Sequence, residues 1–471
     1  MSLLPDAIDV KLSRGHPLLF QCATASWMHL FGPTRESMHT FALSISVGLL
    51  VATYWVGSRV ASQQVGVAAT LLLALNEAFL AQSGILLPEV LLALLGLLAA
   101  GFYITRSPWM YVIAALAALM TKESALVLVL ALLVWHTVSL FMAPIASRRV
   151  KDRWWFVILA SPLLLASSFF VFQKLEFGWY FFPEHLGLIT WDLKDIIYKI
   201  KLAYGDVFES QGMLWLTYAF GLIAPFVWRG LRVNWSLLVV VLNVTAIKIL
   251  FGRWTLPPIP TLVITGLCLA VVFWLISQPL YRTARERGSL VGIGYIFTLG
   301  FLAFSALNFF SDRYLLCLIP FVGLGTLVFL SSALEGQHKW LFPALVLVVA
   351  CAMCLDLGRD DKVGDTRLSY ADDIRVHQEV IHYLESRDLQ RASIQTSFML
   401  SEYLTHFETG YLSVDRPFSQ IGVERDENTR YIVCSTSTPG SEYEEVKRSD
   451  FVLRESFASG KAWVEFYERP K

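Results

Sequence analysis

The sequence predicts an all-α polytopic membrane bundle followed by a small α/β domain outside the membrane. Of its 471 residues, 55% are hydrophobic and 16% are charged, and the mean hydropathy is +0.55. A soluble protein of this length needs more charge to cover its surface, so composition favours a membrane protein. Lysine plus arginine equals aspartate plus glutamate, at 38 each. This balance gives no indication of a nucleic-acid partner.

Long apolar runs recur along most of the chain. A helix needs about 20 residues to cross the hydrocarbon core, and we expect about 12 spans on that basis. The pair that meets at Lys122 is short, which predicts a tightly packed hairpin. The expected spans lie near residues 38–58, 64–82, 84–104, 109–121, 123–142, 154–173, 212–230, 235–252, 257–278, 289–309, 314–333 and 339–356.

The charges of the short loops predict the orientation in the plasma (inner) membrane. Every second loop is basic, and basic loops stay in the cytoplasm. The N-terminal segment and the C-terminal tail then both lie on the outer side. A polar N-terminal segment needs a means of crossing, so we expect one more helix upstream of Met1. The basic loops contain Arg59, Arg106, Arg148, Arg149, Lys151, Arg153, Arg229, Arg232, Arg282, Arg285, Arg287 and Lys339.

After the membrane bundle at 38–356, residues 357–471 predict a periplasmic or extracellular α/β domain. The stretch ADDIRVHQEVIHYLESRD has helical spacing, with Ile374, His377, Ile381 and Leu384 on one side. RYIVCSTS and KAWVEFYER are rich in β-branched and aromatic residues and predict strands. The domain has no nucleotide-binding motif and no metal-ligand spacing. We therefore interpret it as a recognition or structural cap.

Polar and charged residues collect at the outer ends of the expected helices. Placing a charge inside a bilayer costs roughly 2.5–3.5 kcal/mol, so such residues are usually functional or paired. Carboxylates, cations and an imidazole at the mouth of an apolar bundle suit a substrate with a lipid tail and an anionic head group. The set comprises Asp6, Asp9, His16, Glu89, Lys122, Glu123, Arg253, Asp312, Arg313 and Tyr314.

The cations of this set also have a structural explanation. Lys122 can snorkel to the membrane interface or pair with Glu123. Arg313 can anchor the interface beside Tyr314.

The acids and the histidine have such an explanation too. Glu89 follows Pro88 at a helix start, where a carboxylate gains from the helix dipole. Asp6 and Asp9 can be solvated residues of the terminal segment, and His16 can shape an extended turn before a proline. The functional interpretation depends on the convergence of all these residues on one face.

Four stretches carry a resemblance: GHPLLFQCATASWMHLFGPTRESMH, QVGVAATLLLALNEAFLAQSGILLPEVLLALLGLLA, AALAALMTKESALVLVLAL and SDRYLLCLIPFVGLG. In this order they resemble the C-type glycosyltransferases that use polyprenyl-phosphate sugars, the superfamily of protein O-mannosyltransferases and lipid A aminoarabinose transferases. The first stretch is similar to the family's first outer loop, so the resemblance implies that residues 1–37 form this loop with an amphipathic helix. The helix that precedes this loop in the family is absent here, and the position that is commonly aspartate is Glu89.

The resemblance implies transfer of a sugar from a polyprenyl phosphate to an acceptor hydroxyl on the outer face, with inversion. A carboxylate takes the acceptor proton; we expect Asp9 in this role and Asp6 as the second choice, with Glu89 holding a cation or the sugar. Cations stabilise the departing phosphate. The expected substrate-binding residues are His16, Lys122, Arg253, Arg313 and Tyr314. The sugar, the acceptor (glycan, lipid or protein) and any need for a divalent metal stay open, and we assign no metal ligand.

Two other functions remain open at this point. A catalytically degenerate relative would act as a binding or assembly protein through its C-terminal domain and would tolerate loss of Asp6 and Asp9. A transporter of a lipid-linked substrate would also need charge at the membrane. It should show internal repeats and helices broken near mid-membrane, whereas the charges here are at helix ends.

Overall fold

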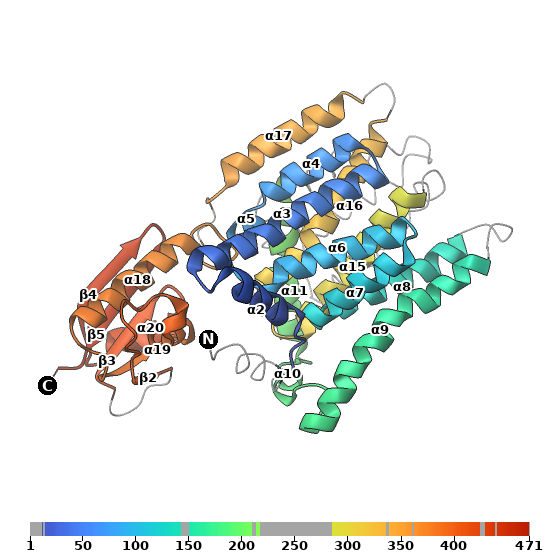
Figure 1. Ribbon diagram of the computed structural model, residues 1–471. Coiled ribbons are helices and arrows are strands. Elements are labelled where there is room, and N and C mark those ends of the chain that lie inside the picture. The colour runs from blue at the N-terminus through green and yellow to red at the C-terminus, as the bar shows by residue number, and fades with distance from the viewer. Residues whose placement is uncertain are drawn as a thin grey trace. The chain divides into compact units, whose positions relative to one another are not determined.

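A computed structural model describes residues 12, 15–142, 150–209, 213–216, 285–335, 339–359, 362–423, 429–438 and 440–470. The chain divides into two compact units, Met1–Leu357 and Gly358–Lys471. The first unit is helical and the second contains a sheet (Figure 1).

The first unit is a bundle of helices, several of them lying side by side in Figure 1. Short π and 3-10 helices (η2 and η4) interrupt the α-helical order. The elements are α2 Leu19–Phe31, α3 Arg35–Val60, α4 Gln63–Ala74, α5 Glu77–Gln82, α6 Pro88–Ile104, α7 Pro108–Thr121, α8 Ala125–Met142, α9 Val150–Phe177, α10 Pro183–Gly187, α11 Leu193–Tyr204, η2 Gly205–Glu209, α15 Arg285–Leu307, η4 Asp312–Leu318, α16 Ile319–Ala333 and α17 Leu341–Asp356.

Within the described residues, 4 helices are long and apolar enough to cross a membrane: Arg35–Val60, Trp154–Phe177, Arg285–Leu307 and Asp312–Ser332. Along α9, large apolar side chains point away from the protein, and Leu164 and Leu175 are 71% and 82% exposed. An extended apolar surface of this kind is typical of contact with lipid. The first unit therefore has the helices of a membrane protein.

The expected number of about 12 spans is not confirmed. Gln63–Ala74, Pro88–Ile104, Pro108–Thr121, Ala125–Phe141 and Leu341–Asp356 are apolar helices of only 10–17 residues. The expected spans near 212–230, 235–252 and 257–278 lie outside the described residues, apart from 213–216.

The run 64–82, which we expected as one span, is two helices. α4 ends at Ala74 and α5 begins at Glu77. Asn76 lies between them and its Oδ1 accepts a hydrogen bond from the Phe79 backbone nitrogen at 3.1 Å. Asparagine is a favoured N-cap because its side chain replaces a missing backbone acceptor. Polar Asn76 therefore starts a new helix inside an apolar run.

Small residues let the helices approach closely. A Cβ atom added to Gly57 on α3 would lie 2.8 Å from the Cα of Gly66 on α4. A Cβ atom on Gly292 of α15 would collide with the indole of Trp135 on α8, which is fully buried. The hydrophobic effect does not drive helices together inside lipid, so the association of membrane helices depends on such close packing. α6 packs against α3 and α7, and η4 packs against α6.

The second unit is a small α/β fold, as expected. Its helix α18 Tyr370–Ser386 packs on β4 and β5 of a 5-stranded sheet with the order β2-β1-β3-β5-β4. β1 is parallel to β2 and β3, whereas β5 is antiparallel to β3 and β4. The other elements are β1 Ser393–Thr396, α19 Phe398–Thr405, η5 Phe407–Thr409, β2 Gln420–Gly422, β3 Tyr431–Ser435, α20 Gly440–Arg448, β4 Val452–Ser459 and β5 Ala462–Glu468.

The buried face of α18 differs slightly from the expected one. His377, Ile381 and Leu384 are buried, but Ile374 is only half-buried, and Val376 and Val380 complete the face. A sheet needs a broader apolar stripe than one row of side chains, which is why the contact includes both valines. The strands expected in RYIVCSTS and KAWVEFYER are β3 and β5.

Candidate functional site

Glu89 lies at the start of α6 and is almost fully buried. Pro88 occupies the first helical turn, where its fixed φ is tolerated and its missing N–H is not needed. Glu89 follows in the same turn and is 2% exposed. The positive end of the helix dipole stabilises a carboxylate there. A buried charge of this kind still needs partners.

Lys122 supplies the first partner from the end of α7. The helix ends at Thr121, and Lys122 has an extended backbone with φ −158° and ψ 139°. Its Nζ donates a hydrogen bond to Glu89 Oε1 at 2.8 Å. The sequence had left open a pairing of Lys122 with its neighbour Glu123. The structure instead pairs Lys122 with the carboxylate of another helix.

The 3-10 helix η4 adds a second cation and an aromatic ring. Arg313 Nε lies 3.7 Å from the same Glu89 Oε1. The ring centroid of Tyr314 lies 3.4 Å from Lys122 Nζ, which is a cation–π contact. The backbone nitrogen of Arg313 donates to Asp312 Oδ1 at 3.0 Å. The consecutive helices α6 and α7 and the distant η4 thus meet at one carboxylate oxygen.

Glu89 has a second carboxylate oxygen, Oε2, that takes no part in these contacts. Both cations approach Glu89 Oε1, and Asp312 beside Arg313 adds a second carboxylate to the cluster. Glu89 Oε2 is buried and accepts no hydrogen bond from the described part of the chain. A buried acceptor without a donor costs about 1–3 kcal/mol. The cluster is therefore suited to receive an anion at its cations and a hydroxyl or other donor at Glu89 Oε2.

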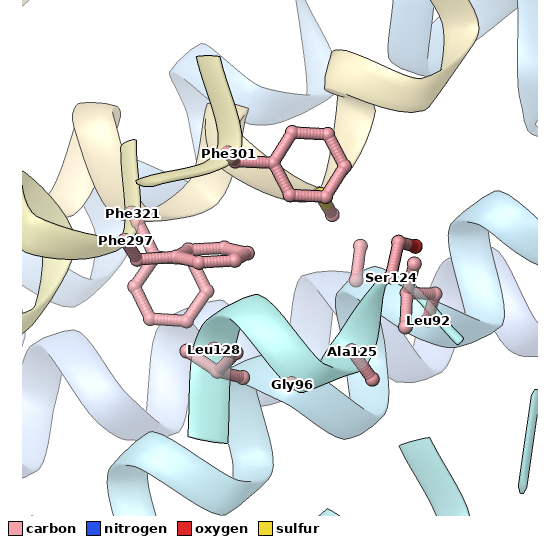
Figure 2. Close-up of a pocket in the computed structure, with 10 residues that line it drawn as sticks. Leu92, Gly96, Ser124, Ala125, Leu128, Phe297, Phe301 and Phe321 are labelled. Carbon is pink, nitrogen blue, oxygen red and sulfur yellow. The ribbon is translucent and has the colours of Figure 1, made fainter. Parts of the chain in front are cut away.

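A small apolar pocket lies beside this cluster, between α6, α8, α15 and the segment η4–α16. Figure 2 shows Phe297 and Phe301 on one side, facing Leu92, Ser124 and Ala125 on the other. The cavity is small, about 10 Å³, enough for about one water molecule. The lining residues are Leu92, Ala93, Gly96, Ser124, Ala125, Leu128, Phe297, Phe301, Cys317 and Phe321.

Several residues that line the pocket are close in sequence to residues of the charged cluster. Ala93 lies one helical turn after Glu89, so both point to the same face of α6. Ser124 follows Lys122 by two residues, and Cys317 Sγ donates to the Tyr314 carbonyl at 3.3 Å. Charge and apolar lining therefore lie next to each other, as an amphiphilic ligand requires.

A second cluster forms on the other side of the α7–α8 turn. His16 Nδ1 lies 3.5 Å from Glu123 Oε1. The rings of His16 and His185 have centroids 4.8 Å apart and are tilted by 49°. Burial and the neighbouring His16 lower the pKa of the His185 imidazole, which favours its neutral form.

The structure brings together four of the residues expected at the site: Glu89, Lys122, Arg313 and Tyr314. His16 lies with Glu123 and His185 in the second cluster. Asp6, Asp9 and Arg253 lie outside the described residues, so the expected base and the third cation remain expectations.

Sequence reasoning did not predict the contact of Glu123 with His16 and did not consider His185. Glu123 was placed in the charged layer at the outer face, and its pairing with Lys122 was left open. His185 lies in the long segment between α9 and α11, which has no periodic signal that points toward the bundle. The one available signal is that a histidine follows Pro183-Glu184 at the start of a short helix.

Sequence comparison identifies no relative: no model of a protein family matches the chain, and neither does any curated protein. Two crystal structures of ArnT from Cupriavidus metallidurans, one in the apo state and one bound to undecaprenyl phosphate, align with a TM-score of 0.40. The identities are 14% and 13%, and each alignment covers 96% of this chain and 87% of the other.

Proposed function

We propose that this protein is a membrane glycosyltransferase that moves a sugar from a polyprenyl-phosphate donor to an acceptor hydroxyl. One observation carries the proposal: Lys122 and Arg313 share a single oxygen of buried Glu89 beside an apolar pocket. Two cations that lie close together can both donate to the oxygens of a phosphate. The adjoining pocket is lined by apolar side chains, which match the apolar character of a prenyl chain.

The phosphate of the donor binds at Lys122 and Arg313 in this proposal. Arginine and lysine are the usual partners of phosphate oxygens. Tyr314 holds the Lys122 ammonium over its ring, which limits the positions that the ammonium can reach. The pocket between α6, α8 and α15 is too small for a prenyl chain as it stands. Donor binding therefore requires the aromatic side chains of α15 to move apart, and Phe297 and Phe301 are the ones that line the pocket.

The chemical step is a single displacement at the anomeric carbon. The acceptor oxygen forms a bond to this carbon, and the bond from the carbon to the phosphate oxygen breaks with its electron pair on the phosphate. The acceptor proton passes to a carboxylate, for which we propose Asp9 and, second, Asp6. Glu89 Oε2 accepts a hydrogen bond from a hydroxyl of the sugar. Lys122 and Arg313 stabilise the charge that develops on the departing phosphate.

We also propose an orientation for the reaction. The alternation of basic loops puts the first loop, the charged cluster and the C-terminal domain on the outer side of the inner membrane. Sugar transfer then occurs at the periplasmic or extracellular face. The acceptor, whether glycan, lipid or protein, reaches the site from that side.

A binding or assembly role is favoured by a different aspect of the same geometry. Lys122 and Glu89 satisfy each other at 2.8 Å, which is also what a purely structural ion pair between helix ends does. In that case the cations hold the bundle together and bind no phosphate. The experiment must therefore separate phosphate chemistry from folding.

The test offers the purified chain a panel of polyprenyl-phosphate sugars with a membrane extract as acceptor and measures release of free polyprenyl phosphate. We expect release by the unaltered chain and a loss of about 10²–10³-fold in Lys122→Ala, the effect of removing one charge-stabilising donor. Lys339→Ala is the matched control, because this exposed lysine lies in the loop before α17. No release from any donor by correctly folded protein would favour the assembly role.

A further inference from the structure

A second group of side chains, which meets at the α7–α8 turn, has types and positions that fit a metal ion. His16 comes from the segment before α2, Glu123 from the turn, and His185 from α10. One ligand atom from each residue lies within 4.8 Å of the other two. We infer that His16, Glu123 and His185 form a binding site for a divalent metal ion of the zinc type.

The ligand chemistry fits this class of ion. Zinc prefers imidazole nitrogen and carboxylate oxygen at about 2.0–2.2 Å, so two ligands of a tetrahedral site lie about 3.4 Å apart. His16 Nδ1 and Glu123 Oε1 are separated by 3.5 Å. The centroids of the two imidazole rings lie 4.8 Å apart, and His185 offers a ligand atom within 4.8 Å of those of His16 and Glu123. Two nitrogens and one oxygen leave a coordination position open, as in zinc sites that bind a further ligand.

An unsatisfied oxygen provides independent support. Glu123 Oε1, the atom that faces His16, is buried and has no hydrogen-bond partner in the part of the chain that the structure describes. Buried carboxylate oxygens normally have a donor or a cation. An ion between Glu123, His16 and His185 satisfies this oxygen.

The backbone around the histidines is held in place by packing. Gly15 has φ +74°, a conformation that glycine adopts without strain, and its nitrogen donates to the Leu12 carbonyl at 3.0 Å. A Cβ atom on Gly15 would lie 3.1 Å from both Trp179 and Phe182. The Phe182 ring in turn lies 5.3 Å from the His185 ring. The segment before α2 and the segment after α9 are thus in contact before any ion binds.

A metal here joins three segments that are distant in the sequence. Glu123 is the residue after Lys122, so the ion fixes the turn from which Lys122 reaches Glu89. The positive charge of the ion also adds to that of the neighbouring cations. The metal is thus a positioning element for the charged cluster, and its binding does not depend on the proposed transferase activity.

An ion pair between protonated His16 and Glu123 is the simpler explanation, and it makes a different prediction. An ion pair of this kind needs no metal and does not involve His185. A metal site needs all three side chains, and it loses the metal when any one of them is replaced.

The experiment measures zinc in the purified full-length chain by mass spectrometry. The protein carries an affinity tag without histidine, is equilibrated with zinc chloride in detergent and is then desalted. We expect about one zinc ion per chain. We expect zinc at the background level in His185→Ala and in Glu123→Gln, which keeps the size of the side chain but removes its charge. A monodisperse elution profile shows that each variant is folded.

His29→Ala and Glu184→Gln are the matched controls, because both residues are exposed and neither belongs to the three-residue cluster. These variants should keep the metal. Zinc should raise the midpoint temperature of unfolding of the unaltered chain and leave that of His185→Ala unchanged. Background zinc in the unaltered chain, or equal zinc in His185→Ala, would overturn the inference.

Discussion

Lys122 donates a hydrogen bond of 2.8 Å to Glu89, which lies 33 positions earlier in the chain and in another helix. The contact joins the end of α7 to the start of α6, two helices that pack against each other. Arg313 approaches the same oxygen from η4 at 3.7 Å. This meeting of three helix ends organises the candidate site.

The Glu89–Lys122 pair can be tested by a double-mutant cycle with Glu89→Gln and Lys122→Met. We expect each single variant to lower the free energy of unfolding, because each leaves a charge without its partner in a place where water is scarce. The double variant should lose less than the sum, with a coupling of about 1–3 kcal/mol. Reversible unfolding in mixed micelles measures all four free energies. Additive losses would show that the two side chains do not act as a pair.

Asp9 is expected to be the general base, and Asp9→Asn tests this. The amide cannot take a proton, so release of polyprenyl phosphate should fall by about 10²–10⁴-fold while expression is unchanged. Asp388→Asn serves as the control, since Asp388 is exposed with φ +52°, a conformation that asparagine tolerates equally well. Full activity in Asp9→Asn would remove Asp9 from the mechanism and make Asp6→Asn the next variant.

Helix packing in the bundle predicts opposite results for two glycines. Gly292→Ala places a methyl group against the buried indole of Trp135, and overpacking of this kind costs about 1–3 kcal/mol. Gly323→Ala on α16 has nothing within 4 Å of the new methyl group and gains about 1 kcal/mol of helix propensity. A thermal-shift assay in detergent should show a lower midpoint temperature for the first variant and an equal or higher one for the second. The reverse order would contradict the packing of α8 on α15.

The thiol of Cys434 should be unreactive in the folded C-terminal unit. Burial, with Glu465 nearby, raises its pKa to about 12, and Cys434 lies on β3 with 1% exposure. Maleimide labelling followed by peptide mass spectrometry at pH 8 should modify exposed Cys22 and leave Cys434 intact until denaturant is added. Equal labelling of both cysteines without denaturant would refute this.

The same pKa predicts how the stability of the C-terminal unit depends on pH. The unfolded chain loses the thiol proton above its ordinary pKa of about 8.5, whereas the folded unit keeps it. The unfolded state then binds fewer protons, so the contribution of Cys434 to stability is complete below pH 8.5 and falls as the pH rises toward 12. Cys434→Ala should flatten this part of the curve, as measured by denaturant midpoints for the C-terminal unit of the full chain.

Much of the fold follows from local sequence patterns. The runs 38–58, 109–121 and 339–356 predict helices that the structure contains as α3, α7 and α17. The spacing in α18 and the β-branched residues of β3 predict the elements of the C-terminal unit. The run 64–82 was predicted as one helix, but buried Asn76 divides it into two. A single capping hydrogen bond starts the second helix, and the apolar pattern of the run does not show it.

The candidate site was predictable in part. Glu89, Lys122, Arg313 and Tyr314 were expected together because charge near apolar helix ends is costly and must be paired. Their actual contacts were not predictable, and the contact of Glu123 with His16 was not anticipated. His185 was not found at all, because an irregular segment between helices has no periodicity that indicates what it packs against.

The sequence by itself determined that this chain forms apolar helices followed by a small α/β unit, because helical periodicity and hydrophobic burial act over neighbouring residues. Only the tertiary structure decided that Lys122 pairs with Glu89 and that Glu123 lies with His16 and His185. Those contacts depend on how helices pack side by side, and close approaches such as Gly57 to Gly66 set that packing. Side chains that are far apart in the chain come into contact only when the helices that carry them have packed together.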